Sequence, residues 1–401
     1  MEMISLHPRT RIAAAPDGAV LVGHPWGVHT VRGDYLGLQR LVGTPVDPST
    51  LDAAELRFLA TFPFLVVHWL GDALRLVPLG VDARPAEPLA DDVPVRLSRF
   101  AFFHGADDRL VLESPLSLYR AELDPSLSFV ASLVRARPIG SFAGLERMVV
   151  RNLVSAGLLG GEDSPELRTW EFHDLLFHTR SRAGRHDHPV GGTYPHRDAE
   201  APAIKPAGPG PVIELLVPGE RDVPFTTVLE RRCSTRSYGE RGVTLDELGE
   251  LLHRAAWRGG RPYPSGGASY DLEVYLAVRR CEGLERGVYH YDALAHVLRL
   301  VNPDLGELAR RPADFEDPPD VLLVITSRFR RVSWKYTSIA YATTLRNVGV
   351  LFQTLYLVAS SMGLAACAIG SGDVAVAEKV LGLPFTEEST VGEFALGSLR
   401  V

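Results

Sequence analysis

Hydrophobic residues follow two different spacings in the second half of the chain, and together they predict a mixed helical and stranded structure. Apolar side chains alternate with others over residues 272–278, which predicts a strand. Residues 321–325 are continuously apolar, as in a strand that is buried on both faces. Residues 244–256 open with a Thr-Leu-Asp-Glu capping box, and residues 339–362 carry apolar side chains at helical spacing, so we expect a helix over each.

Shorter elements complete this half. Residues 288–291 and 297–300 are expected to form a hairpin, and residues 393–397 a last strand. Polar residues interrupt the long helix at Arg346, Asn347 and Gln353, so we do not expect it to span a membrane.

The first half of the chain alternates hairpins with short helices, in a pattern that repeats once. Hairpins are expected over residues 18–31, 64–77 and 109–120, and helices over residues 34–42, 52–62, 127–134 and 142–156. The repeat predicts a pair of winged-helix-like modules, residues 1–80 and 81–160. Without a basic face such modules suit a peptide or protein ligand better than DNA, and a packing domain with no ligand is the alternative.

A connecting segment, residues 161–211, is predicted between the halves. It contains an amphipathic helix over residues 170–178, a loop with several histidines, and a stiff proline-rich stretch at residues 199–211, where we place the domain boundary. The histidine spacing matches no ordinary zinc pattern, so no metal site is predicted. Residues 212–401 are expected to be the catalytic domain.

Composition narrows the function classes. A chain of 401 residues is expected to form two or three domains, and its net charge of −7 without a basic run argues against nucleic-acid binding. The sequence shows no signal peptide, and the three cysteines are widely separated, which fits a reducing cytoplasm.

An anion clamp is predicted at residues 231–238. Arg232, Ser234 and Arg236 alternate, so an extended backbone can direct two guanidinium groups and a hydroxyl at one phosphate. Cys233, between them, is interpreted as a small buried residue rather than a redox thiol. A solvated basic loop is the alternative interpretation of the segment.

In two other stretches, glycine allows the backbone to approach a planar ring closely. The first consists of Pro264, Ser265, Gly266 and Gly267, and the second of Ala368, Ile369 and Gly370. Only three of the 42 basic residues are lysine, and Lys335 stands beside Tyr336, which suggests a site that needs a cation able to lose its proton. Sequence neighbours point apart on a regular element, so the pair needs an irregular turn to converge. A surface lysine next to a core tyrosine is the alternative. Together, the anion clamp, the two stretches that contain glycine and the Lys-Tyr pair suggest a flavin enzyme.

Residues 212–401 resemble the nitroreductase-like flavin fold and, within it, the SagB-type azoline dehydrogenases. The resemblance rests on residues 232–238, 264–268, 287–291, 335–336 and 367–370. It implies an α+β fold in which a nitroreductase-like FMN domain follows the winged-helix-like modules. It also implies a homodimer with FMN at the interface.

The resemblance assigns roles to individual residues. It implies that Arg232, Ser234 and Arg236 hold the flavin phosphate and ribityl end, and that Pro264, Ser265 and Gly266 line the ring from the other subunit. Ile369 and Gly370 would approach the ring, Lys335 and Tyr336 match the catalytic pair, and Arg400 is a further candidate for the phosphate. The sequence departs from the family pattern at Cys233, at Asp271, where proline is usual, and at Ser371.

The implied activity is oxidation of peptide thiazolines or oxazolines to azoles, in the biosynthesis of a ribosomally made peptide. The partners expected are an azoline-containing precursor peptide, a second copy of the chain and a cyclodehydratase, with no nucleic acid and no membrane. Residues 1–160 could bind a leader peptide by strand addition. Two alternatives remain open: an NAD(P)H-dependent nitro- or quinone reductase, and a flavin-free peptide-binding scaffold.

Overall fold

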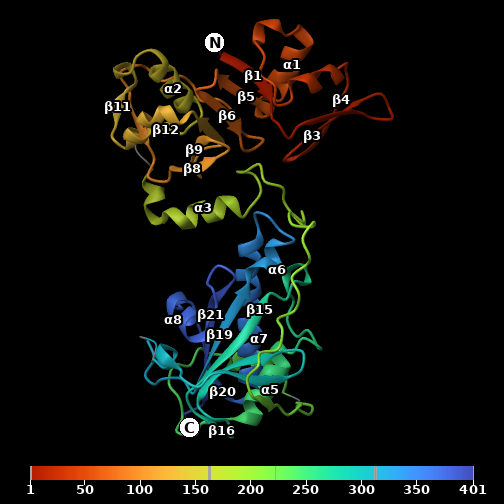
Figure 1. Cartoon of the computed structure of the whole chain (residues 1–401), viewed down its shortest axis with the longest axis vertical. Helices are drawn as coiled ribbons and strands as arrows, with labels where there is room; N and C mark the ends of the chain where they lie inside the picture. The colour runs from red at the N-terminus through yellow and green to blue at the C-terminus, as the bar shows by residue number, and fades with distance from the viewer. Residues whose placement is uncertain (1, 161–163, 222, 311, 313, 401) are drawn as a thin grey trace. The chain divides into compact units, whose positions relative to one another are not determined.

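The computed structural model describes residues 2–160, 164–221, 223–310, 312 and 314–400. The chain divides into two compact units, Met1–Val190 and Gly191–Val401, and each is described by itself (Figure 1). The division falls inside the connecting segment expected from the sequence, a few residues before its proline-rich stretch.

The first unit is built on a six-stranded antiparallel sheet with the strand order β1-β5-β6-β10-β9-β8. Its strands are β1 (Glu2–Leu6), β5 (Val66–Leu70), β6 (Leu74–Pro78), β8 (Phe102–Ala106), β9 (Arg109–Glu113) and β10 (Tyr119–Leu123). Two three-stranded sheets accompany it: β2 (Arg11–Ala14), β3 (Val20–His24) and β4 (Gly27–Val31), and β11 (Arg137–Pro138), β7 (Pro94–Leu97) and β12 (Leu159–Gly160). The α-helices are α1 (Ala53–Thr61), α2 (Gly144–Ser155) and α3 (Phe172–Arg180).

The expected pair of winged-helix-like modules is not what the structure shows. The three hairpins form, but β6 from the first predicted module pairs with β10 from the second, with Leu76 opposite Ala121. One hydrophobic core, from Leu6 to Leu159, then serves both halves. The sequence of a hairpin and a helix does not specify which distant strand will pair with the edge of the hairpin. Here the edge strands of the two hairpins, β6 and β10, pair with each other.

Two of the expected helices in this unit are 3₁₀ segments instead. These are η1 (Leu36–Leu41) and η4 (Pro125–Val134), which has a kink at Leu127. Gly37 in the first, and serines at alternate positions in the second, are weak α-helix formers. Both segments still bury apolar residues three positions apart, a spacing that is also typical of α-helices.

The second unit is built on a seven-stranded antiparallel sheet with the order β13-β18-β17-β15-β19-β21-β20. Its strands are β13 (Val212–Glu214), β15 (Leu272–Val278), β17 (Gly287–Asp292), β18 (Val297–Asn302), β19 (Val321–Arg328), β20 (Leu364–Ile369) and β21 (Glu388–Ser398). A short parallel pair joins β14 (Val243–Thr244) to β16 (Cys281–Glu282). The helices are α4 (Phe225–Arg231), α5 (Leu245–Ala256), α6 (Phe329–Ser333), α7 (Ala340–Met362) and α8 (Val374–Leu381).

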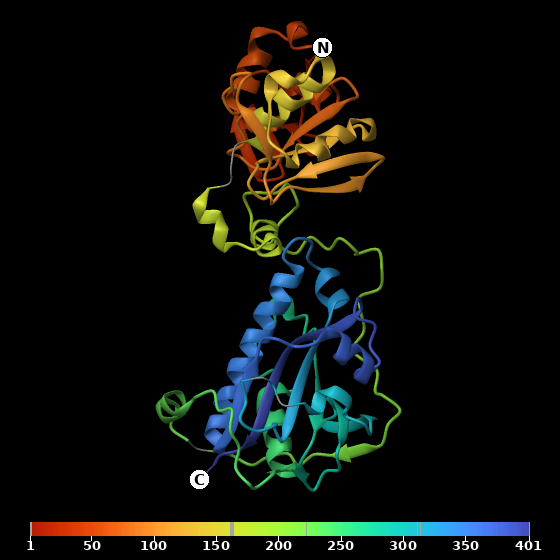
Figure 2. The ribbon, with the colours of Figure 1, turned by 90° about the vertical axis from the view of Figure 1, so that its left-hand side faces the viewer.

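Alternation along β15 explains how the sheet is covered. Leu272, Val274 and Leu276 enter the core that α5 and α7 complete, whereas Tyr275 and Ala277 enter a second core completed by α8. The long helix α7 runs beside the sheet (Figure 2) and carries side chains to both ends of the candidate site described below. The sequence predictions for β15, β19, α5 and α7 are confirmed, including the capping box between Thr244 and Glu247. Within the described residues, no helix has the length and apolar character needed to cross a membrane.

The proline-rich stretch is not a free linker, because the surface of the second unit holds it by several hydrogen bonds. Arg331 donates to the carbonyl oxygens of Pro202 and Ala203, at 2.8 and 2.9 Å, and Arg328 donates to that of Ala203 at 2.8 Å. The Nζ of Lys205 lies 2.5 Å from an oxygen of buried Glu388. The stretch therefore belongs to the second unit.

Candidate active site

The predicted anion clamp lies at the end of α4 and runs beside β20. The Thr235 amide donates to the Ala366 carbonyl at 2.8 Å, which fixes the segment against the sheet. The Ser234 hydroxyl is 2.8 Å from the hydroxyl of Tyr356 on α7, and the Ala368 amide donates to that same hydroxyl at 2.7 Å. Tyr356 thus joins two segments that were predicted separately.

The clamp arginines are available to an anion. The Arg232 guanidinium lies over the Tyr356 ring at 5.3 Å, and Arg236 is exposed. Neither has a carboxylate partner among the residues that the structure describes. Arg400 differs, since it pairs with Glu316 at 3.2 Å and Asp317 at 2.7 Å.

Cys233 is exposed, contrary to its interpretation as a buried residue. Its thiol lies 3.4 Å from the Thr235 hydroxyl. In this segment it is the Thr235 backbone that pairs with the sheet, and the Cys233 side chain remains outside the core.

The Pro264–Gly267 stretch forms a tight loop against α7, within a 3₁₀ turn, η7 (Gly266–Ala268). A Cβ on Gly266 would meet Thr343, and one on Gly267 would meet Tyr336 and Lys335, so both positions require glycine. Gly267 has φ +64, and Ala268 and Tyr270 also have positive φ. Ala268 and Tyr270, which are not glycine, store strain in this conformation, and the surrounding contacts must hold it. Pro264 is exposed at the start of the loop.

Asn347 on α7 and Asp271 hold this loop in place. The Asn347 side chain accepts a hydrogen bond from the Gly266 amide at 2.8 Å and donates to Ser265 Oγ at 3.2 Å. It also donates to Oδ1 of Asp271 at 2.7 Å. Ser265 Oγ in turn accepts from the Tyr270 amide at 2.9 Å, which closes the loop on itself.

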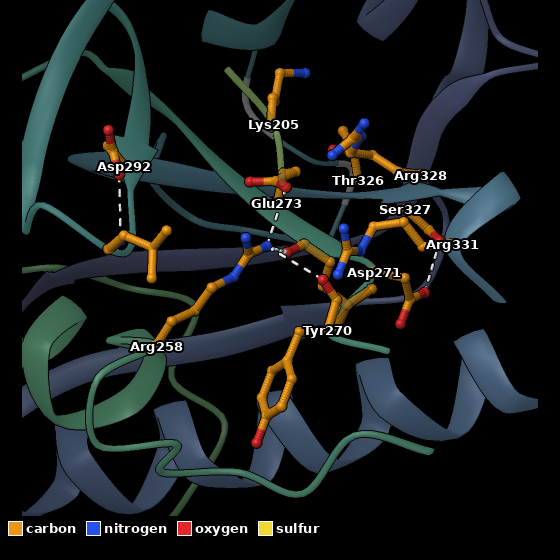
Figure 3. A network of polar contacts seen from close by, with 12 residues as sticks. Lys205, Arg258, Tyr270, Asp271, Glu273, Asp292, Thr326, Ser327, Arg328 and Arg331 are labelled. Carbon is orange, nitrogen blue, oxygen red and sulfur yellow. Dashed lines mark hydrogen bonds and ion pairs between the residues drawn. The ribbon is translucent and has the colours of Figure 1, made fainter. Parts of the chain in front are cut away.

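A second polar network fixes the far end of the loop (Figure 3). The Arg258 guanidinium donates to the carbonyl oxygens of Tyr270 and Leu272, at 3.2 and 3.0 Å, and to Glu273 at 3.0 Å. Burial opposes ionisation of Glu273, but its contacts with His290 and Arg258 outweigh that effect and lower its pKa. The buried charges compensate each other and hold the loop end rigid.

Lys335 and Tyr336 lie in an irregular turn that follows α6, as their convergence requires. The Lys335 Nζ donates to the Gly267 carbonyl at 3.3 Å and lies 5.6 Å from the centre of the Tyr336 ring. The Tyr194 amide donates to the Lys335 carbonyl at 3.0 Å, and Gly192 forms a β-bridge with Tyr336. Residues at the start of the second unit therefore line the Lys-Tyr turn.

The Ala368–Gly370 stretch is the end of β20, and it becomes more exposed toward Gly370. Ile369 lies opposite Glu393 on β21, a buried carboxyl that accepts a hydrogen bond from Thr390. Burial raises the pKa of Glu393 above its ordinary value.

The predicted residues thus form two clusters that α7 connects. Arg232, Ser234 and Ala368 gather around Tyr356, whereas Ser265, Gly266, Gly267, Lys335 and Tyr336 gather near Asn347. The two anchoring residues, Asn347 and Tyr356, are nine positions apart on α7, or about 13 Å along the helix axis. At the Tyr356 cluster, Arg232 has no carboxylate partner among the described residues and lies near the Ser234 hydroxyl, and this donor set fits the phosphate of a cofactor such as FMN.

Sequence reasoning missed Tyr194, Tyr356 and Asn347 as members of the site. Tyr356 and Asn347 lie within the long helix, where they resemble ordinary interruptions of an apolar pattern. Asn347 was noted only because it breaks that pattern. Tyr194 lies in a loop without periodicity, and no signal in the sequence distinguishes it.

Comparisons with known proteins identify the family of this chain. The sequence model of the nitroreductase family matches residues 229–398, and that of the cyanobactin oxidase ThcOx family matches residues 95–187. A putative nitroreductase of Methanocaldococcus jannaschii, MJ1384, is 31% identical over 170 residues, which are 40% of this chain and 86% of that protein. The chain belongs to the nitroreductase family.

The comparisons also confirm the resemblance to the SagB-type azoline oxidases. The microcin B17-processing protein McbC of Escherichia coli is 34% identical over 114 residues, which are 26% of this chain and 42% of McbC. A solved structure of the E. coli microcin synthetase McbBCD complex, with truncated pro-MccB17 bound, aligns with 47% of this chain and 78% of that chain, at 24% identity and a TM-score of 0.37. The ThcOx match lies in the first unit, outside the nitroreductase domain.

Proposed function

We propose that this chain is an FMN-dependent dehydrogenase that oxidises thiazolines or oxazolines in a ribosomally made peptide to the aromatic azoles. The observation that carries the proposal is the packing of Lys335 and Tyr336 on the Gly267 backbone, inside a nitroreductase-family domain. The similarity to McbC and the ThcOx match support the choice of an azoline substrate.

In this proposal, Arg232, Arg236 and the Ser234 hydroxyl would hold the FMN phosphate end, and Ile369 and Gly370 would line the ring. Proteins of the nitroreductase family usually bind FMN, and the chemistry that it supplies when bound is that of a two-electron acceptor. The glycines at 266 and 267 let the loop pack directly on Thr343 and on the Lys-Tyr turn. We place this second loop at the ring of a partner subunit's flavin, in a homodimer.

Aromatisation of an azoline removes two hydrogens, one of them as a proton. Lys335, as the free amine, takes that proton at Nζ, and the Tyr336 hydroxyl passes it on. The Gly267 carbonyl fixes the position of Nζ, because it accepts a hydrogen bond from it. The cation formed at Nζ faces the ring of Tyr194 at 5.7 Å, which favours the charged product of the step.

The first unit offers a site for the precursor peptide. Of the sheet strands that the structure describes there, β8 is at one end of the order and pairs with β9 on one side only. The opposite edge strand, β1, has further backbone bonds to Val46, so it is less open. We place leader-peptide addition at β8, and protection of residues 102–106 from hydrogen exchange on adding the precursor peptide tests this placement.

The test of the activity uses purified protein, FMN and a peptide containing one thiazoline. Loss of two hydrogens from the peptide, detected by mass spectrometry and dependent on FMN, supports the proposal. Reduction of a nitroarene or quinone by NADPH, with the azoline left unchanged, would instead identify a reductase. A protein that retains no FMN but still binds the peptide would identify a scaffold. A cyclodehydratase partner is expected to increase turnover, because it makes the azoline.

A further inference from the structure

We infer that Asp271 is a positioning residue for Lys335 and acts through Asn347 and the loop of residues 265–267. Asp271 stands where the family resemblance leads one to expect proline, so it is a feature of this chain that the proposed function has not used. The inference rests on the proposed function only in treating Lys335 as the group that takes the proton. The contacts themselves do not depend on it.

Asp271 is fully buried, with an exposed fraction of 0%, and hydroxyl and amide groups surround its carboxylate. Ser327 donates to Oδ2 at 2.7 Å, Thr344 donates to Oδ2 at 2.9 Å, and Asn347 donates to Oδ1 at 2.7 Å. Figure 3 shows Asp271 and Ser327 facing each other. A buried carboxylate is retained only where donors of this kind compensate for its lost hydration.

The carboxylate determines which way the Asn347 amide points. An ionised Asp271 can only accept hydrogen bonds, so the Nδ2 of Asn347 must face it. The Oδ1 of Asn347 is then left facing the Gly266 amide, which donates to it at 2.8 Å. If the Asn347 amide turned over, its Nδ2 would face the Gly266 N–H and two donors would oppose each other.

The orientation of the Asn347 amide also affects the position of Lys335, through the loop of residues 265–267. Gly266 and Gly267 leave no room for a side chain, so the loop lies directly on α7 and on the Lys-Tyr turn. The Gly267 carbonyl follows the anchored Gly266 amide by one residue and accepts the hydrogen bond from Nζ. A displacement of this loop therefore moves the position of the lysine amine, and small displacements of a reacting group cost about 10²-fold in rate.

Asp271 also holds the segment that carries Lys335. Ser327, which donates to its carboxylate, is the second-last residue of β19, and the amide of Arg328, the last residue, donates to the Asp271 backbone carbonyl at 2.9 Å. This strand leads directly into α6 and then into the Lys-Tyr turn. The loop and the turn are thus both fixed to one buried carboxylate.

The experiment compares Asp271→Asn, Asn347→Ala and the exchanged pair D271N/N347D with the wild-type chain. The exchanged pair keeps an amide donating to a carboxylate, and a carboxylate oxygen at 347 can still accept from the Gly266 amide. Asp320→Asn is the matched control, because Asp320 is also 0% exposed but pairs with Arg279 and Arg280 instead.

Two measurements are made on each variant: hydrogen exchange of the Gly266 amide, and kcat and KM for the thiazoline peptide. We expect Asp271→Asn and Asn347→Ala each to raise Gly266 exchange about tenfold, as for the loss of one hydrogen bond. We expect kcat to fall about 10- to 100-fold with KM little changed. The exchanged pair should restore both values, and Asp320→Asn should change neither.

Unchanged Gly266 exchange in both Asp271→Asn and Asn347→Ala would overturn the inference, and so would an exchanged pair that behaves like Asp271→Asn. Should Asp271→Asn fail to fold, Asn347→Ala decides, because it leaves Asp271 with its Ser327 and Thr344 partners. Absence of azoline oxidation in the wild-type chain would count against the proposed function alone, since the exchange measurement still tests the positioning.

Discussion

The side-chain amine of Lys335 donates to the backbone carbonyl of Gly267 across 3.3 Å, although 68 positions separate the two residues in the chain. A backbone carbonyl cannot take up a proton, so this contact holds the amine in place without competing for its charge.

Replacing the Lys-Tyr pair should abolish turnover and leave flavin binding intact. We expect Lys335→Ala to lower kcat by about 10²- to 10⁴-fold, as for loss of a general base, and Tyr336→Phe to lower it less. Flavin content, measured by absorbance after gel filtration, should stay at the wild-type level. Lys379→Ala, at an exposed position of α8, is the control and should be fully active.

The clamp arginines should determine the affinity for FMN. Arg232→Ala removes a charged donor from the phosphate, which is worth roughly 1.5–3 kcal/mol, so the Kd for FMN should rise about 10- to 100-fold. Fluorescence titration of the apoprotein measures this. The neighbouring exposed Arg231 provides the matched control, and an equal loss of affinity in Arg231→Ala would mean that only net charge matters.

A methyl group at position 267 should impair the site more than the fold. Gly267→Ala places a Cβ against Tyr336 and Lys335 at a residue with φ +64, so we expect about 1 kcal/mol of lost stability and a larger loss of kcat. Denaturant unfolding and steady-state kinetics measure the two effects. Gly349→Ala, whose Cβ would meet nothing within 4 Å on α7, should instead be neutral or stabilising. Equal effects of both substitutions would contradict the described loop.

Asp187 should be a major source of stability in the first unit. It is 1% exposed and lies 3.0 Å from Arg120 and 3.5 Å from His7, and these groups hold its pKa below the ordinary range although burial opposes this. Asp187→Asn removes one of the two carboxylates that pair with Arg120 and leaves only Glu122, at 3.0 Å, so we expect a loss of about 3 kcal/mol in unfolding free energy. Asp174→Asn on α3, where the aspartate is 60% exposed, should cost almost nothing.

The first unit should lose stability as the pH falls from about 6.5 to about 4. Burial, with the nearby His29 and His7, lowers the pKa of His24 from 6.5 to about 4. The unfolded chain therefore binds this proton at a higher pH than the folded chain, so the contribution is complete above pH 6.5 and is lost through pH 4. The denaturant midpoint at several pH values measures it. His24→Asn should flatten the profile, whereas an unchanged slope would assign the effect to other groups such as His7.

Much of the second unit could be predicted because the hydrophobic residues of its strands and helices recur at clear intervals. The strand over residues 272–278 and the helix over residues 339–362 each bury one consistent face, so alternation and helical spacing located them closely. The first unit could not be predicted as well, since its hairpins are local but the pairing of β6 with β10 depends on which edges meet.

The residues of the site could be predicted only where several chemically functional residues lie close together in the sequence. Arginines around Ser234, paired glycines and a rare lysine stand out from the surrounding sequence. The contact between Asp271 and Asn347 joins residues 76 positions apart and has no such signal. A side chain that orients another side chain is recognised only when the fold brings both together.

Azoline oxidation by the FMN-loaded protein is tested most directly by its anaerobic absorbance, after mixing in turn with a thiazoline peptide and with NADPH. We predict that the azoline bleaches the flavin band and that NADPH does not, with the bleaching slowed in Lys335→Ala. Bleaching by NADPH alone would contradict the proposed azoline oxidation and identify a reductase.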